Sequence, residues 1–163
     1  MLSEDKLLSD CEIRRTRDSG PGGQHRNKVE TAIEIIHQPT GIRAFAGERR
    51  SQEQNRRMAI RRLRMELSVR VRAVKSAVVE PSELWRQRCR GGRIACNEQH
   101  TDFPAMLAEA LDAIDAKDFD VRTAAAALGC SSSQLTRFIG RVPAALLQVN
   151  QSREQRGLRK LKT

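Results

Sequence analysis

The sequence predicts an α+β protein, with a small domain of short strands and one long basic helix followed by an all-helical C-terminal region. Two observations support this class. Residues 11–49 contain β-rich segments separated by turn signals, whereas apolar residues recur at helical spacing beyond residue 80. A chain of 163 residues suits one domain or two small ones. We expect the small domain over 1–78, a helical region over 79–149 and a basic tail over 150–163.

Three segments of the N-terminal part are predicted to be strands. Residues 11–17 alternate between polar and apolar side chains, and 31–38 contain four β-branched residues. Residues 42–49 follow a turn signal at 39–41, where proline and glycine frame a threonine, so 31–49 is expected to form a hairpin.

A long helix is predicted over 52–75. Ser51 is placed to cap its first turn, with Gln54 as the partner residue of a capping box. Its apolar residues fall near one face, and arginines cover the rest of its surface. The apolar face consists of Met58, Ala59, Leu63, Leu67 and Val71.

The C-terminal region is predicted to contain five shorter helices. They cover residues 81–90, 103–118, 121–128, 131–139 and a segment of nine residues that begins at Pro143. Ser82 and the serine at 131 are candidate N-caps, and Gly91 and Gly92 are expected to end the first of these helices. Residues 93–102 are expected to be irregular. The pair 121–139, with its glycine turn at 129, resembles a helix-turn-helix. We favour a plain αα-hairpin for it, because the turn pattern is generic and the preceding helix is strongly acidic.

Charge is distributed along the chain in blocks. The net charge is +10 and the isoelectric point about 10.5. Residues 43–75 hold ten arginines and one lysine against three glutamates, a net +8, whereas 98–120 carry a net −6 and 150–163 a net +4. A small protein with this balance is expected to bind nucleic acid. No apolar run approaches the roughly 20 residues that span a membrane, and the scarcity of aromatic residues favours phosphate contacts over base stacking.

The four cysteines form no CxxC pair. The nearest approach to a metal-binding spacing is Cys89, Cys96 and His100, which is wider than usual zinc-ligand spacing. We therefore expect reduced, mostly buried thiols in a cytoplasmic protein. The acidic N-terminus does not look like a signal peptide.

A loop rich in glycine separates the first two predicted strands. Its glycines at 20, 22 and 23 can adopt positive φ and leave the backbone uncovered. Bare N–H groups can donate hydrogen bonds to an anion or a developing oxyanion. A lone glycine cluster is more often a surface turn, so a functional interpretation of this loop depends on the residues around it.

Those surroundings match a longer pattern. The stretches RDSGPGGQHRNKVETAIEIIHQPTGI and ERRSQEQNRRMAIRRL closely resemble the catalytic domain of class I peptide chain release factors, over about residues 11–70. The matching residues are Arg17, Ser19 to His25, Asn27, Lys28, Ala32, Ile35, His37, Pro39 to Ile42, Arg50 to Gln52, Asn55, Ala59 and Leu63. Arg26 departs from the pattern, because the family usually carries an apolar residue there.

The resemblance implies a specific site. The loop would enter the peptidyl transferase centre of the large ribosomal subunit, where the backbone N–H of Gln24 stabilises the transition state as water attacks the ester of peptidyl-tRNA. The Gln24 side chain would admit water and exclude bulkier nucleophiles, and Gly22 and Gly23 would be needed because side chains there clash. The resemblance also implies that no metal or other cofactor is required, because the ribosome supplies most of the site. Gln24 is also a candidate for N5-methylation by a glutamine methyltransferase. His25 and His37 are expected to be structural or RNA-contacting, not general bases.

Contacts with RNA are expected from basic and polar residues in the loop, the long helix and the tail. These are Arg17, His25, Arg26, Asn27, Lys28, Arg50, Arg56, Arg57, Arg61, Arg153, Arg156, Arg159, Lys160 and Lys162.

Ten residues precede the first matching strand, and no codon-reading tripeptide is recognisable after the match. The chain therefore looks similar to the small, codon-independent peptidyl-tRNA hydrolases that rescue stalled ribosomes, and it is expected to be a monomer off the ribosome. Action on a split large subunit with a partner protein is a second version of this hypothesis. The alternative is an RNA- or DNA-binding helix-turn-helix module with a catalytically idle loop domain.

Overall fold

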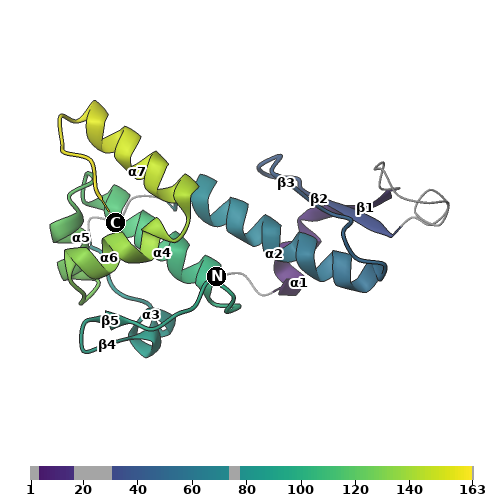
Figure 1. Cartoon of the computed structure of the whole chain (residues 1–163), viewed down its shortest axis with the longest axis horizontal. Coiled ribbons are helices and arrows are strands. Elements are labelled where there is room, and N and C mark those ends of the chain that lie inside the picture. Colours follow the sequence, from purple (N-terminus) through teal and green to yellow (C-terminus); the bar gives the residue numbers. More distant parts are fainter. Residues whose placement is uncertain (1–3, 17–30, 74–77, 163) are drawn as a thin grey trace. The chain divides into compact units, whose positions relative to one another are not determined.

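The computed structural model describes residues 4–16, 31–73 and 78–162 (Figure 1). The chain divides into two compact units, Met1–Leu67 and Ser68–Thr163, which are called the N-terminal unit and the helical unit below. The α+β class is confirmed: one unit is built around a three-stranded sheet, and the other is mostly helical.

The N-terminal unit contains α1 (Glu4–Ser9), β1 (Cys11–Thr16), β2 (Ala32–His37), β3 (Arg43–Ala46) and most of α2 (Gln52–Arg70). The strands pair antiparallel in the order β1-β2-β3. All three predicted strands are present, although β3 is shorter than expected. The short helix α1 was not predicted.

The sheet packs one face against α2. Ile33 and Ile35 of β2, with alanines of β3, are buried together with Ala59 and Leu63 of α2. The predicted apolar face of this helix is therefore confirmed at its centre. Val71 is 40% exposed, because the helix ends at Arg70 instead of residue 75.

The turn between β2 and β3 follows the predicted chemistry. The N–H of Gly41 donates to the carbonyl of His37 over 2.8 Å, and the N–H of His37 donates to the carbonyl of Ile42 over 2.9 Å. Gly41 has φ +68°, a left-handed conformation that glycine adopts without the steric cost of a side chain.

The helical unit contains six further elements after α3 (Glu83–Arg88). They are β4 (Cys89–Arg90), β5 (Arg93–Ile94), α4 (Phe103–Ala116), α5 (Val121–Ala127), α6 (Ser132–Gly140) and α7 (Pro143–Gln155). All five predicted helices are present. The expectation of an all-helical region was wrong in one respect, because β4 and β5 pair as an antiparallel hairpin where the sequence predicted a helix end and an irregular segment.

Trp85 anchors α3 in the core of this unit. The indole is 1% exposed, and its Nε1–H donates to the carbonyl of Leu128 over 2.8 Å. Its ring meets Phe138 edge-on at 6.0 Å between centroids, and Phe138 lies 5.1 Å from Phe103. These contacts join α3, the end of α5, α6 and α4 around one aromatic cluster.

The predicted helix caps are confirmed. Ser51, Ser82 and Ser131 each accept a hydrogen bond from the backbone N–H three residues on. Pro104 and Pro143 lie in the first turns of α4 and α7, where the missing N–H costs nothing. In the part of the chain that the structure describes, no helix is both long and apolar enough to cross a membrane.

Candidate functional site

The glycine-rich loop connects β1 to β2. Its predicted catalytic residues Gly22, Gly23 and Gln24 lie in 17–30, outside the described residues, as do the predicted RNA contacts Arg17, His25, Arg26, Asn27 and Lys28. The structure describes both ends of the loop. Thr16 and Ala32 are paired across the two strands, so the loop leaves and re-enters the same end of the sheet.

Asn55 of α2 holds the returning end of the loop. Its side chain is fully buried, and Nδ2 donates to the carbonyls of Thr31 (2.7 Å) and Arg49 (2.8 Å). Its Oδ1 accepts from the N–H of Arg49 over 2.9 Å. One side chain thus fixes Thr31, immediately before β2, and the connection that leads into α2.

Asn55 was among the residues that carry the resemblance but not among the predicted site residues. The signal was present in the sequence, because an asparagine four residues before Ala59 and eight before Leu63 falls on the buried face of the helix. A polar side chain on such a face needs hydrogen-bond partners inside the protein.

His37 lies at the opposite end of β2 from Ala32. It pairs with Cys11 at the other end of the sheet, and its Nδ1 is 2.8 Å from the hydroxyl of Thr40 in the β2–β3 turn. His37 is five positions along β2 from Ala32, which corresponds to about 17 Å. His37 therefore supports the turn, as predicted for a structural histidine.

The arginines predicted to contact RNA, in α2 and just before it, differ in their exposure and in their ion pairs. Arg50 is exposed, and Arg57 is exposed with its Nε 3.6 Å from Glu53. Arg56 and Arg61 are half-buried. Arg62, which was not predicted as a contact, donates to the carbonyl of Phe45 and pairs with Glu48. Part of the arginine-rich surface thus stabilises the unit itself.

The predicted basic tail is folded back in the structure. Helix α7 continues to Gln155, and Gly157, with φ +71°, ends it. The amide of Asn150 then clasps the returning chain: Nδ2 donates to the carbonyl of Leu161 over 3.1 Å, and Oδ1 accepts from its N–H over 2.7 Å. The tail is therefore held along α7.

The five predicted tail contacts are divided between internal and exposed positions. Arg153 is half-buried and donates from Nε to the carbonyl of Arg159 (2.8 Å) and from Nη1 to that of Phe119. The guanidinium of Arg156 lies 4.4 Å from the Phe119 ring centroid, and Lys160 pairs with Glu154 at 3.1 Å. Arg159 and Lys162 expose their side chains.

Replacing Asn150 by alanine is expected to detach the tail while leaving its charge unchanged. Two hydrogen bonds to Leu161 would be lost, each worth about 1 kcal/mol. We expect the Leu161 amide to exchange with solvent at least tenfold faster, as measured by hydrogen–deuterium exchange. Gln151→Ala, at an exposed neighbour on the same helix, should leave that rate unchanged. If the Leu161 amide exchanged as slowly in Asn150→Ala as in the wild type, the proposed role of Asn150 in holding the tail would be contradicted.

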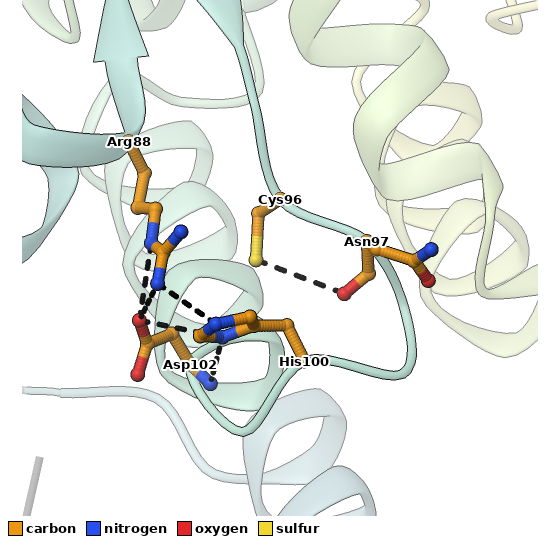
Figure 2. A network of polar contacts seen from close by, with 5 residues as sticks. All are labelled: Arg88, Cys96, Asn97, His100 and Asp102. Atoms are coloured by element: carbon orange, nitrogen blue, oxygen red, sulfur yellow. Dashed lines mark hydrogen bonds and ion pairs between the residues drawn. The ribbon is translucent and has the colours of Figure 1, made fainter.

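Figure 2 shows two of the three candidate metal-binding residues, Cys96 and His100. Arg88 donates to Oδ2 of Asp102 over 2.8 Å from Nη2, and the same Nη2 is 2.8 Å from Nε2 of His100. The backbone N–H of Asp102 donates to Nδ1 of the same ring over 3.1 Å. The Cys96 thiol instead contacts the Asn97 carbonyl at 3.8 Å. Within the described residues, no cluster of three such side chains could hold a metal ion.

Burial raises the pKa of the Cys130 thiol from its ordinary value of 9.0 to about 11, with a further contribution from the neighbouring Cys89 thiol. Burial also raises the pKa of Cys89. The folded protein therefore keeps the Cys130 proton at a pH where the unfolded chain releases it.

The free energy of unfolding is accordingly expected to fall as pH rises from about 9 to about 11. A pKa change of this size corresponds to about 2.7 kcal/mol, which solvent screening at a partly exposed thiol reduces to about 1 kcal/mol. Urea denaturation of the wild type and Cys130→Ala at both pH values measures this difference. An identical pH slope in the two proteins would contradict it.

Comparison with known proteins places the N-terminal unit in a family. The profile of the RF-1 domain family matches residues 7–99, more than half of the chain. Similar curated proteins include peptide chain release factor 1 of Acidiphilium cryptum, 46% identical over 69 residues, which are 42% of this chain and 20% of that protein. The corresponding protein of Symbiobacterium thermophilum is 49% identical over 55 residues, 34% of this chain and 15% of that one.

Peptide chain release factor 1 of Xylella fastidiosa is 48% identical over 59 residues, 36% of this chain and 16% of that protein. The chain thus spans a fifth or less of the length of these relatives. The family match includes the strands on both sides of the glycine-rich loop, α2 with Asn55, and the β4–β5 hairpin. The chain belongs to the RF-1 domain family.

Proposed function

We propose that this protein hydrolyses the ester of peptidyl-tRNA on the ribosome. One observation supports this most strongly: the Gly22-Gly23-Gln24 sequence lies in the loop between β1 and β2, whose ends are fixed by strand pairing and by the buried Asn55. Membership of the RF-1 domain family and similarity to proteins named peptide chain release factors support the same activity.

The proposed chemistry uses backbone more than side chains. The N–H of Gln24 donates to the oxyanion that forms as water attacks the ester carbonyl. The bond from the carbonyl carbon to the tRNA ribose oxygen then breaks, the ribose regains its hydroxyl proton, and the peptide leaves with a new carboxylate. Gly22 and Gly23 leave space for this approach, and the Gln24 side chain helps to select water as the nucleophile.

The histidines that the structure describes make contacts unrelated to the proposed reaction. His37 supports the β2–β3 turn, and His100 contacts Arg88 in the helical unit. This arrangement supports a mechanism in which the loop brings a hydrogen-bond donor into a site that the ribosome supplies.

We further propose that the activity is independent of the codon and serves stalled ribosomes or large subunits. The helical unit supports this, because its exposed basic groups, such as Arg159 and Lys162 of the tail, are suited to phosphates, which carry no sequence information. In this proposal the protein acts as a monomer, and Gln24 is a substrate for a glutamine methyltransferase, which mass spectrometry of the native protein would detect as one added methyl group.

A release assay tests the proposed activity. Purified protein is added to ribosomes that carry labelled peptidyl-tRNA on a truncated mRNA, and free peptide is measured. We expect release that depends on both protein and ribosomes. Binding without any release, unaffected by substitutions in the loop, would overturn the proposal and favour a nucleic-acid-binding protein with an idle loop.

The same assay on isolated large subunits distinguishes the two rescue versions. The structure indicates where to shorten the chain, since Asn150 and Arg153 belong to α7 and contact other parts of the unit. A chain that ends after Gly157 removes three basic residues of the tail and keeps this helix. If the tail recognises whole stalled ribosomes, the shortened chain should lose release there but not on large subunits.

A further inference from the structure

The β4–β5 hairpin presents two arginines at its tip. Arg90 and Arg93 are paired directly across the strands, and Gly91 and Gly92 form the connection between them. Both glycines have positive φ, +56° and +74°, as a two-residue hairpin turn of the primed type requires. The tip therefore has no side chain between the two guanidinium groups.

The hairpin turns these arginines outward. Side chains alternate along a strand, and the neighbouring pair, Cys89 and Ile94, faces the protein: Ile94 is 8% exposed. Arg90 and Arg93 are both exposed. Like charges directly opposite each other in a hairpin are destabilising, and within the described chain neither arginine side chain forms a hydrogen bond or ion pair that would offset this.

The hairpin is held firmly on the helical unit. Ala95 N–H donates to the carbonyl of Arg88 over 2.7 Å, and the Cys89 thiol lies 3.9 Å from the carbonyl of Gly129 in the turn between α5 and α6. A Cβ added to Gly92 would come within 4.0 Å of that same carbonyl. Figure 1 shows the hairpin beside α3 at the edge of this unit. The backbone that carries the two arginines is thus fixed before any ligand arrives.

Three carboxylates of the acidic block over 98–120 have partners inside the helical unit. Asp102 is paired with Arg88 at 2.8 Å, and Asp112 with Arg72 at 2.8 Å. Glu109 accepts from the N–H and the hydroxyl of Ser82 over 2.7 and 2.6 Å. These carboxylates satisfy partners inside the unit, so the objection that acidic side chains repel phosphates from this region is weakened.

We propose that the tip Arg90-Gly91-Gly92-Arg93 is an RNA-binding finger that contacts backbone phosphates. Two guanidinium groups on one face of a short rigid hairpin can each pair with a phosphate oxygen, and the side-chain-free turn lets the RNA backbone approach closely. The choice of RNA as the polyanion rests on the proposed function. The finger belongs to the helical unit and would add a contact separate from the Gly22-Gly23-Gln24 loop.

Binding of the full-length protein to a fluorescein-labelled RNA hairpin, followed by anisotropy over a range of salt concentrations, tests the proposal. Arg90→Ala/Arg93→Ala removes the finger's charge from exposed positions. We expect weaker binding at low salt and a slope of log K against log salt that is shallower by roughly 1.5, because two phosphate contacts are lost. Arg86→Ala/Arg122→Ala, at two other exposed positions of the same unit, is the matched control and should keep most of the slope.

An unchanged slope in Arg90→Ala/Arg93→Ala, or an equal loss in both double variants, would overturn the proposal. Tighter binding of an acidic protein than of the RNA hairpin would overturn it as well. Thermal melting checks that each variant is folded. The binding assay involves no hydrolysis, so a failed release assay with intact finger-dependent binding would count against the proposed function alone.

Discussion

Gly23→Ala is expected to reduce peptide release on stalled ribosomes by about 10²- to 10³-fold, the usual effect of losing one oxyanion-stabilising donor. The added methyl group would prevent the backbone from presenting the Gln24 N–H at the ester. Because the change lies in a loop beyond the paired ends of β1 and β2, the free energy of unfolding should change by less than about 0.5 kcal/mol. Single-turnover release and urea denaturation measure the two effects.

Gly41→Ala is the matched control for this substitution. It makes the same chemical change in the same unit, in the turn at the opposite end of β2, where φ is +68°. A non-glycine residue in this conformation costs about 1 kcal/mol of stability, but the turn is remote from the loop, so release should be retained. Normal release by Gly23→Ala, or equal loss in both variants, would contradict the role of the loop.

Asn55→Ala is expected to lower the free energy of unfolding of the N-terminal unit by about 3 kcal/mol. The buried amide makes three hydrogen bonds, each worth about 1 kcal/mol. The substitution also frees Thr31 at the returning end of the loop, so release should fall even under conditions where the protein remains folded.

The distribution of aromatic residues makes this prediction testable within the full chain. The single tryptophan, Trp85, lies in the helical unit, so its fluorescence follows that unit, whereas circular dichroism follows both. Asn55→Ala should shift only part of the circular dichroism transition to lower urea. Gln54→Ala, at an exposed neighbour on α2, should shift neither. A full-size shift in the tryptophan transition alone would contradict the assignment of Asn55 to the N-terminal unit's stability.

Elements whose signals are local were predicted well from the sequence. The three strands, the β2–β3 turn and the serine caps depend on residues within a few positions of one another. The C-terminal end of α2, in contrast, depends on a residue that is distant in the sequence. Arg72 donates to the carbonyl of Val69 over 3.3 Å and pairs with Asp112, so a residue 40 positions away helps to end the helix at Arg70. No local pattern reveals such a partner.

The β4–β5 hairpin shows a second limit. Two glycines after a helical segment were interpreted as a helix end, and left-handed glycines do serve there. The same conformations also build a two-residue hairpin turn. The pairing of Cys89 with Ile94, and the burial of Ile94, decide between these possibilities, and both depend on the tertiary structure.

The sequence predicted the chemistry of the candidate site more fully than the contacts that hold the surrounding segments in place. The resemblance identified Gly22, Gly23 and Gln24, which remain predictions, but not Asn55 as the residue that holds Thr31. The basic character of the tail was evident from its composition. The attachment of the tail through Asn150 could not be predicted, because the hydrogen bonds between its side-chain amide and the Leu161 backbone involve no charged residue or sequence motif.

Peptide release compared across three ribosomal complexes tests the proposed rescue function most directly. The complexes carry the same labelled peptidyl-tRNA and differ only in the A site, which holds the end of a truncated mRNA, a stop codon or a sense codon on intact mRNA. We predict rapid release on the truncated mRNA and no preference for the stop codon over the sense codon. Release at the stop codon alone, or no release in any complex, would contradict codon-independent hydrolysis.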